Sequence, residues 1–259
     1  MLVSETLAQQ TQLGRVVPAY HQFLASFPTP SACAAAPLGD VLRAWEGLGY
    51  NRRASNLHRA ATVITVEHGG SVPDSLEGLL ALPGVGPYTA RAVLAFAFER
   101  DVGIVDTNAG RVLSRAVAGR PLRPAEAQDL VDAMVPPGRA WSFGQALLDL
   151  GATVCTARAP LCPSCPVRRR CRWATAGRTG PDPANGSAGV STAQSRFAGS
   201  DREGRGRIVA ALRAGPVVGG ALAAVAGWPD DPRRARLVTE RLAAEGLAVV
   251  DAEGVWHLP

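Results

Sequence analysis

The feature that most constrains this chain is a cluster of cysteines near residue 160. Four of its five cysteines fall within 17 residues, with six, two and five residues between them: Cys155, Cys162, Cys165 and Cys171. A secreted disulfide framework would spread its cysteines through a small chain, so the clustering predicts a metal centre in a reducing compartment. The fifth, Cys33, is expected to be a buried apolar residue.

Two kinds of metal centre fit four close thiolates. Zinc sites with four cysteines usually contain two close pairs spaced by two to four residues, and only Cys162 and Cys165 form such a pair here. An iron–sulfur cluster tolerates the observed spacing and is the favoured prediction, with structural zinc as the alternative. No flavin or nicotinamide fingerprint accompanies it. The cluster is therefore expected to shape a loop rather than to perform the main chemistry.

The basic residues are all arginine, 27 of them, and the formal net charge is +5. Without lysine, no reaction can proceed through a side-chain amine. Six arginines and no acidic residue lie between residues 151 and 178: Arg158, Arg168, Arg169, Arg170, Arg172 and Arg178. Such a one-sided run favours a phosphate-facing surface over an ordinary solvated face. With no apolar run of the roughly 20 residues that a span needs and no export signal, we expect a soluble protein without a membrane partner.

The pattern of apolar residues divides the chain into four segments. Three- and four-residue spacing predicts helices from Ser4 to about Ala174, and a Gly-, Ser- and Pro-rich stretch follows. Three short helical patterns and a hairpin around Glu253-Gly254 end the chain and suggest a winged-helix-like module. We therefore expect a mainly α protein with helical domains at 1–101 and 102–174, a flexible linker at 175–200 and an α/β module at 201–259.

A glycine-containing turn and an aspartate form a second candidate site. The segment LPGVGPYTA contains Gly84 and Gly86, which can adopt positive φ and let a nucleic-acid backbone approach the next helix, although such a turn can also be a simple connector. Eighteen residues after Tyr88, the segment VDTNAGRVLSR contains Asp106 and Asn108. Asp106 is either a catalytic carboxylate or only a helix N-cap.

Together these motifs resemble the endonuclease III and adenine glycosylase families of the helix-hairpin-helix glycosylase superfamily. The resemblance implies a two-lobed helical core with a helix-hairpin-helix and a [4Fe-4S] loop. It also implies that Asp106 faces the sugar of a flipped nucleotide, with Tyr88 and Asn108 positioning the reacting groups. Bifunctional relatives carry a nucleophilic lysine at the position of Tyr88. This lysine-free chain is therefore expected to remove a base with water, and only the terminal amine could substitute for the lysine.

The first residues narrow the resemblance to the MutY adenine glycosylases. SETLAQQTQ is similar to their SEVMLQQTQ segment, which implies that Glu5 protonates adenine N7 and that Gln10 and Thr11 lie at the opposite base; an exposed helix start is the alternative for Glu5. WEGLGYNRRASNLH is similar to the family's GLGYYxRAxNL segment, which makes Leu48 and Tyr50 the wedge beside the lesion, or alternatively core residues. Asn51 replaces the family's common second tyrosine.

The resemblance covers residues 2 to 175 and predicts a monomeric bacterial enzyme of the cytoplasm and nucleoid. Its substrate would be double-stranded DNA in which adenine is mispaired with 8-oxoguanine or guanine. A glycosylase for T:G or U:G pairs, and an impaired iron–sulfur protein that only binds DNA, are the alternatives. The chain begins three residues before the MutY motif, without the family's LPWR-like segment, so either its start is misassigned or activity is impaired. The tail of roughly 60 residues is too short for the MutT-like domain of many relatives.

Overall fold

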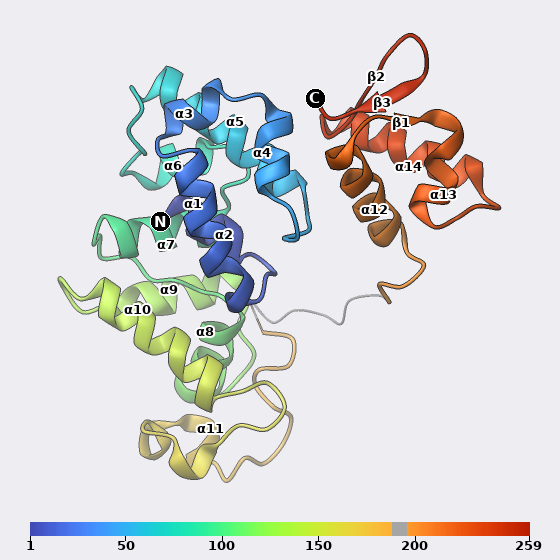
Figure 1. Ribbon diagram of the computed structural model, residues 1–259. Coiled ribbons are helices and arrows are strands. Elements are labelled where there is room, and N and C mark those ends of the chain that lie inside the picture. The colour runs from blue at the N-terminus through green and yellow to red at the C-terminus, as the bar shows by residue number, and fades with distance from the viewer. Residues whose placement is uncertain (188–195) are drawn as a thin grey trace. The chain divides into compact units, whose positions relative to one another are not determined.

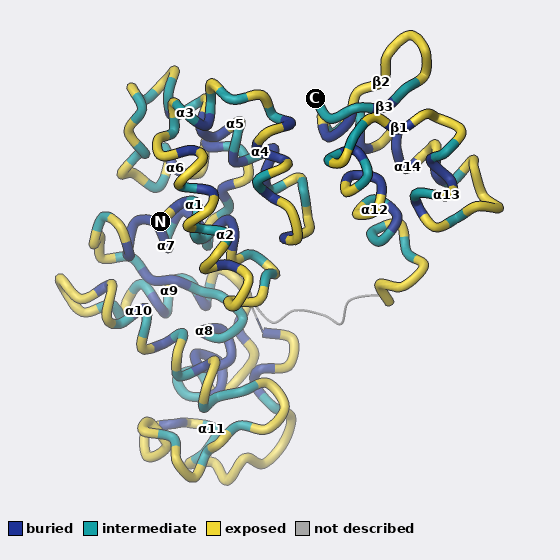
Figure 2. The backbone as a smooth tube through the Cα atoms, viewed as in Figure 1, coloured by how far each residue is buried: buried dark blue, intermediate teal, exposed yellow. Residues whose placement is uncertain are grey.

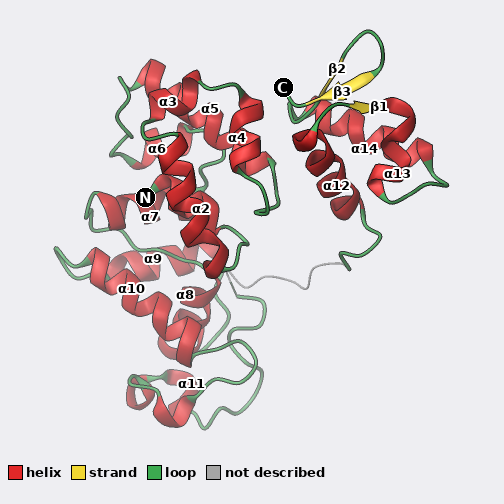
Figure 3. Ribbon diagram, viewed as in Figure 1, coloured by secondary structure: helices red, strands yellow, loops and turns green. Residues whose placement is uncertain are grey.

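The computed structural model describes residues 1–187 and 196–259, which are mainly helical (Figure 3). Their contacts form two compact units. Unit 1 contains Met1, Asp74–Glu77 and Val85–Ala193, and unit 2 contains Leu2–Pro73, Gly78–Gly84 and Gln194–Pro259. Each unit combines segments that are distant in the sequence, and the boundaries at 101 and 174 stay a prediction. None of the described helices is long and apolar enough to cross a membrane.

The first helices of unit 2 surround an aromatic core. Trp45 is fully buried, and its ring meets the ring of Phe23 edge-on with centroids 6.1 Å apart. α3 begins where Thr29 accepts a hydrogen bond from the Ala32 amide (3.1 Å), with Pro30 in the first turn. The helices of this segment are α1 (Leu2–Ala8), α2 (Leu13–Ser26), α3 (Pro30–Ala35), α4 (Leu38–Ala44) and α5 (Arg52–Glu67) (Figure 1).

The C-terminal module of unit 2 has the expected winged-helix arrangement. Its antiparallel sheet has the strand order β1-β3-β2, with Trp256 opposite Val217 on one side and Val250 on the other. The short strand β1 was not expected from the sequence, because two residues are too few to show an alternating pattern. The elements are α12 (Asp201–Ala214), β1 (Val217–Val218), η5 (Gly219–Ala221), α13 (Leu222–Ala226), α14 (Pro232–Ala244), β2 (Val249–Val250) and β3 (Val255–His257).

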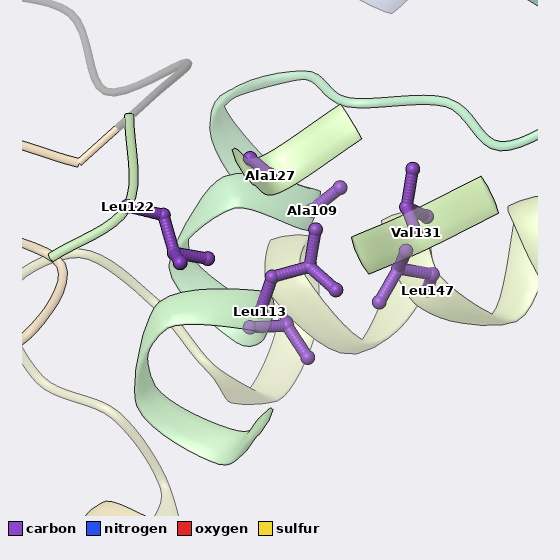
Figure 4. Packing of buried hydrophobic residues seen from close by; sticks show 7 residues of the cluster. Ala109, Leu113, Leu122, Ala127, Val131 and Leu147 are labelled. Atoms are coloured by element: carbon purple, nitrogen blue, oxygen red, sulfur yellow. The ribbon is translucent and has the colours of Figure 1, made fainter. Parts of the chain in front are cut away.

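Unit 1 packs its helices around a core that Figure 4 shows from close by. Ala109 and Leu113 face Val131 and Leu147 from neighbouring helices, and each fully buried aliphatic side chain stabilises the fold by about 1.5–3 kcal/mol. The helices are α7 (Pro87–Ala97), α8 (Thr107–Val112), α9 (Pro124–Met134), α10 (Ala140–Asp149) and α11 (Arg172–Thr175). Short turns of other helical types connect them: η1 (Leu113–Ala118), η2 (Leu150–Val154), η3 (Cys162–Ser164) and η4 (Arg168–Arg170).

The segment predicted to be a flexible linker, 175–200, is in part packed. Ala184 and Ser187 are buried, and the Ser187 hydroxyl accepts a hydrogen bond from the Leu122 amide at 3.1 Å. Its middle, 188–195, lies outside the described residues. Composition could not predict this packing, because only one small apolar residue and a few polar contacts hold the described part of the segment in place.

Candidate active site and cysteine loop

The glycine turn connects α6 (Leu76–Ala81) to α7, as predicted for a helix-hairpin-helix. Gly84 has φ +78°, and a Cβ there would come within 2.6 Å of the Asn56 Cβ, so both conformation and space require glycine. Gly86 is the N-cap of α7 with extended backbone, and a Cβ there would meet no atom within 4 Å. The chain itself thus leaves open space at the amide end of α7, where a phosphate could approach.

Asp106 is the N-cap of α8 and is also held by a side chain. Its Oδ1 accepts the Ala109 amide at 2.7 Å, and its Oδ2 accepts the Asn108 side-chain amide at 2.8 Å. The capping role predicted as the alternative is therefore present. It does not compete with catalysis, because a carboxylate has about four acceptor positions and the described residues use two of them.

A buried arginine extends this network to the cysteine loop. The Arg111 guanidinium donates to the Asn108 Oδ1 (2.7 Å) and to the carbonyls of Gly151 (2.8 Å) and Cys155 (3.1 Å). Gly151 is required here, because a Cβ would lie 2.5 Å from the Asn108 carbonyl oxygen. The orientation of Asp106 is thus coupled, through Asn108 and Arg111, to the turn that leads into the first cysteine.

Tyr88 and Glu5 lie on different units. Tyr88 is half-buried in the first turn of α7 and packs against the apolar cluster that contains Phe96 and Ile104. Glu5 is half-buried in α1 of unit 2. The predicted convergence of Glu5 and Asp106 on one nucleoside remains a prediction.

The residues predicted to contact the opposite base and those predicted to form the wedge all lie in unit 2. Gln10, Leu48 and Tyr50 line one groove of about 580 Å³. Gln10 and Tyr50 both have left-handed backbone, with φ of +55° and +45°, which is uncommon for residues other than glycine and is found at functional sites. Tyr50 is 46% exposed, whereas Leu48 is only 7% exposed. Of the two predicted wedge residues, Tyr50 is therefore the exposed one, and its role as a wedge stays a prediction.

Arg53 holds these residues in place and was missed in the sequence. Its guanidinium donates to the carbonyls of Gln9 (2.6 Å) and Gly49 (3.2 Å), which directly precede Gln10 and Tyr50. It also donates to Thr6, Leu7 and Leu48 carbonyls and to the Thr11 hydroxyl. The guanidinium lies over the rings of Trp45 and Tyr50. The sequence signal was its match to the arginine of the family's GLGYYxRAxNL segment, which says nothing of acceptors more than 40 residues away.

The four cysteines Cys155, Cys162, Cys165 and Cys171 line one narrow cavity with apolar neighbours such as Val112 and Trp173. All four are free thiols. Among the described residues no three ligating side chains are close enough to hold a single metal ion. The donor set, four thiolates in a largely apolar lining, fits an iron–sulfur cluster.

Arg115 fixes the loop around this cavity and was also missed. It is 1% exposed and forms a two-pronged ion pair with Asp182, at 2.8 Å and 2.5 Å, from within the predicted linker. It donates as well to the carbonyls of Thr156 (2.7 Å) and Ala157 (3.0 Å) and lies over the Trp173 ring. Burial by itself would lower the pKa of Arg115, but the Asp182 carboxylate raises it above its ordinary value.

The six arginines of the predicted phosphate-facing surface are exposed around the cysteine loop, where Figure 2 shows α11 and its neighbours largely exposed. Within the described ranges, none of the six forms an ion pair. A surface of unpaired positive charge next to a structured loop suits contact with a polyanion.

Comparison with known proteins identifies DNA repair proteins and adenine DNA glycosylases as relatives of this chain. The profile of the HhH-GPD superfamily of base excision DNA repair proteins matches residues 3–136. The adenine DNA glycosylase of Mycolicibacterium smegmatis is 44% identical over 263 residues, which cover 100% of this chain and 86% of that protein. The adenine DNA glycosylase of Homo sapiens is 42% identical over 176 residues, 66% of this chain and 32% of that protein.

Two solved structures share the fold. A thermostable thymine-DNA glycosylase has a TM-score of 0.62 at 28% identity, over 68% of this chain and 83% of its own. An endonuclease III–DNA covalent intermediate has a TM-score of 0.62 at 26% identity, over 68% of this chain and 84% of its own. These matches confirm the predicted helical, endonuclease III-like fold.

Proposed function

The chain belongs to the adenine DNA glycosylases of the HhH-GPD superfamily of base excision DNA repair proteins, and we propose that its substrate is adenine mispaired with 8-oxoguanine or guanine. The proposed reaction is hydrolysis of the N-glycosidic bond of that adenine. The proposal depends most on the orientation of Asp106. The Ala109 amide and the Asn108 side chain donate hydrogen bonds to its carboxylate, and Arg111 links Asn108 to the cysteine loop.

Hydrolysis requires two different carboxyl groups. Breaking the bond leaves negative charge on the departing purine and positive charge on the sugar. Glu5, in its protonated form, donates a proton to adenine N7 and so neutralises the leaving base. Asp106, whose carboxylate is oriented by the two hydrogen bonds it accepts, stabilises the oxocarbenium-like sugar and helps water to attack it.

Tyr88 and Asn108 complete the proposed site. Asn108 donates to the Oδ2 of Asp106 and thereby directs the other carboxylate positions toward the sugar. Tyr88 occupies the position where bifunctional relatives carry their lysine, and the chain contains no lysine. No Schiff base can form on a lysine, so strand cleavage by that route is excluded and hydrolytic release of the base is the proposed reaction.

DNA must be opened for this reaction, because a stacked adenine is out of reach. In our proposal the amides after Gly84 and Gly86 and the exposed arginines bind phosphates, while Tyr50 enters the gap beside the lesion. Gln10 and Thr11 meet the opposite base, and Leu48 supports Tyr50 from its buried position.

The cysteine cavity would hold a [4Fe-4S] cluster bound by Cys155, Cys162, Cys165 and Cys171. When bound, the cluster cross-links the loop that carries the basic surface. The protein's own contribution is the Arg115–Asp182 pair and the Arg111 contacts, which fix the loop on either side of the cavity. We propose that the protein acts as a monomer on duplex DNA, at the bacterial nucleoid in the cytoplasm.

Single-turnover assays on matched duplexes test the substrate. We expect adenine release from A:8-oxoG and A:G pairs, and none from T:G or U:G pairs. The structural similarity to a thymine-DNA glycosylase makes T:G the sharpest competitor. Release of thymine without release of adenine would replace our proposal by that rival. Borohydride trapping should yield no covalent adduct between a side chain and DNA, since no lysine is present; an adduct at the terminal amine would show that this amine substitutes for the lysine.

A further inference from the structure

We propose that Trp45 is a positioning residue for extrusion of the adenine, because its indole N–H fixes the peptide that precedes Tyr50. Trp45 is fully buried, so it acts through Tyr50 and does not contact DNA itself. The inference rests on the proposed function, which places Tyr50 in the gap beside the lesion. It adds a residue that holds this wedge in its exposed conformation.

The backbone of Tyr50 needs support from its surroundings. Its φ is +45°, in a loop where Gly47 (+74°) and Gly49 (+68°) also have left-handed backbone. Glycine adopts this conformation at no steric cost, whereas a residue with a Cβ adopts it only where neighbouring contacts hold it there. Tyr50 is therefore the position in this loop at which the chain must supply such contacts.

Hydrogen bonds fix both peptide groups that flank the Tyr50 Cα. The Gly49 carbonyl, in the peptide before Tyr50, accepts from the Trp45 Nε1 (3.1 Å) and from the Arg53 guanidinium (3.2 Å). The Tyr50 carbonyl accepts from the Arg53 amide at 2.9 Å. Because a peptide group is planar and φ is the rotation relative to the preceding peptide plane, the orientation of the Gly49 carbonyl sets the φ of Tyr50 directly.

Trp45 is itself a rigid support. Its side chain is fully buried, and its ring meets the Phe23 ring edge-on. A buried indole N–H needs an acceptor, and the Gly49 carbonyl is the one it has in this loop. The carbonyl of Trp45 also accepts from the Leu48 amide at 3.3 Å. Trp45 thus closes the loop through its backbone as well as through its side chain.

The ring of Tyr50 is linked to Trp45 through Arg53. The Arg53 guanidinium lies 5.3 Å from the Trp45 ring centroid and 5.7 Å from the Tyr50 ring centroid. Tryptophan gives the strongest cation–π interaction of the aromatic side chains, so it supports the guanidinium that lies over Tyr50. On the other side of Tyr50, the Asn51 Oδ1 accepts from Arg213 of α12 at 2.7 Å. The loop is therefore held on both sides of the tyrosine.

Packing and positioning make different demands on residue 45. An aromatic ring of any kind can pack against Phe23, whereas only the indole N–H can donate to the Gly49 carbonyl. The two roles are therefore separated by a change that removes the N–H and keeps the ring.

The test measures extrusion and base release separately, with the full chain in saturating excess over an A:8-oxoG duplex. A 2-aminopurine placed next to the adenine becomes more fluorescent when its stacking is lost, and adenine release is followed in a single turnover. Benzothienylalanine in place of Trp45 exchanges the indole N–H for sulfur. It should lower the fluorescence rise and slow adenine release about five-fold, because the Gly49 carbonyl loses one of its two donors. Affinity for an undamaged duplex should not change.

Two ordinary substitutions support this comparison. Trp45→Phe also removes the donor and should lower extrusion and release as benzothienylalanine does, with an added loss of thermal stability. Phe23→Leu is the matched control, because it disturbs the same aromatic core and a phenylalanine ring has no N–H to lose. It should lower the unfolding temperature while extrusion and release stay at the unmutated values.

Tyr50→Ala tests whether Trp45 acts through the wedge. In the Tyr50→Ala chain, loss of the N–H at position 45 should have no further effect on extrusion or release, because no ring is left to position. Additive losses would show that Trp45 stabilises the fold and not the wedge. Unchanged extrusion with benzothienylalanine would overturn the proposal, as would an unmutated chain that binds the duplex without unstacking the probe.

Failure of the proposed reaction gives a different result. An unmutated chain that unstacks the probe but releases no adenine would contradict the reaction, while the fluorescence of the variants would still decide the role of Trp45.

Discussion

The wedge loop (residues 48–51) and the cysteine loop (residues 155–171) are each organised around one arginine, half-buried Arg53 and buried Arg115, but the two arginines are balanced differently. Arg115 is paired with the Asp182 carboxylate, which raises its pKa. Arg53 pairs with no carboxylate among the described residues; its partners are carbonyls and one hydroxyl, and burial lowers its pKa.

The difference concerns the arginine at the centre of each loop and not the exposed arginines around it. Arg115 is neutralised by Asp182, so the interior of the cysteine loop can be rigid before DNA arrives. The wedge loop keeps a partly buried positive charge beneath two residues with left-handed backbone, Gln10 and Tyr50. DNA phosphates would offset the desolvation free energy of that charge, so the wedge loop should become more rigid when DNA binds.

The largest effect is expected from Arg115→Met. It leaves Asp182 without its partner and frees the carbonyls of Thr156 and Ala157, which should cost about 3–5 kcal/mol of stability. Urea unfolding and iron content per chain measure both consequences. Arg178→Met, an exposed arginine over the same Trp173 ring, is the control and should retain iron and stability. Equal iron content in both variants would remove Arg115 from the account of the loop.

Arg53→Met should cost less stability, about 2–3 kcal/mol, because no carboxylate is left unpaired. Its main consequence is functional, since Gln10 and Tyr50 lose the contacts that fix their backbone. DNA affinity and adenine release should fall while iron content stays constant. Arg59→Met, an exposed position on the same helix, should change neither. If Arg53→Met lost iron but bound DNA normally, the two arginines would not have the separate roles we assign.

Asp182→Asn should cost about 2 kcal/mol with a defined pH dependence. Burial by itself would raise the pKa of Asp182, but hydrogen bonds from Arg115 and the Ala184 amide lower it overall. A lowered folded-state pKa gives stability that is complete above the ordinary aspartate pKa and is lost as pH falls through the lowered value. The difference in unfolding free energy between the two chains should thus be constant from about pH 8 to 5 and shrink below about 4. A difference that grew toward acid would contradict the pairing.

The smallest effect compares the two glycines of the hairpin. Gly84→Ala should destabilise by about 1–2 kcal/mol, because of its positive φ and the nearby Asn56 on the helix of Arg53. Gly86→Ala should leave thermal unfolding unchanged, since its backbone is extended and the space is open. Only DNA affinity should fall in Gly86→Ala. Equal destabilisation by both changes would show that both glycines are required for packing and that Gly86 has no separate role in DNA binding.

Local patterns predicted the helices, the hairpin turn and the C-terminal module, because apolar periodicity and glycine placement act over a few residues. The four cysteines line one cavity, and this could be predicted because they are close together in the sequence. Arg53, Arg115 and Arg213 escaped prediction. Each acts through backbone carbonyls or side chains far along the chain, and a carbonyl acceptor leaves no trace in a sequence.

Two local readings also needed three-dimensional context. Leu48 and Tyr50 were indistinguishable as wedge residues, and only burial separates them. The composition of 175–200 suggested a flexible segment, yet Asp182 within it is the partner of the most buried arginine. In both cases the outcome depends on the surroundings of a single residue, which a sequence pattern does not reveal.

The most direct test of the account is single-turnover release of adenine from an A:8-oxoG duplex by the chain and by Asp106→Asn. Loss of the carboxylate should reduce the rate by about 10³-fold or more, while duplex binding and iron content persist. Glu5→Gln should do the same, whereas Asp129→Asn and Glu67→Gln, exposed carboxylates elsewhere, should release adenine at the unmutated rate. An Asp106→Asn variant that releases adenine as fast as the unmutated chain would contradict the mechanism.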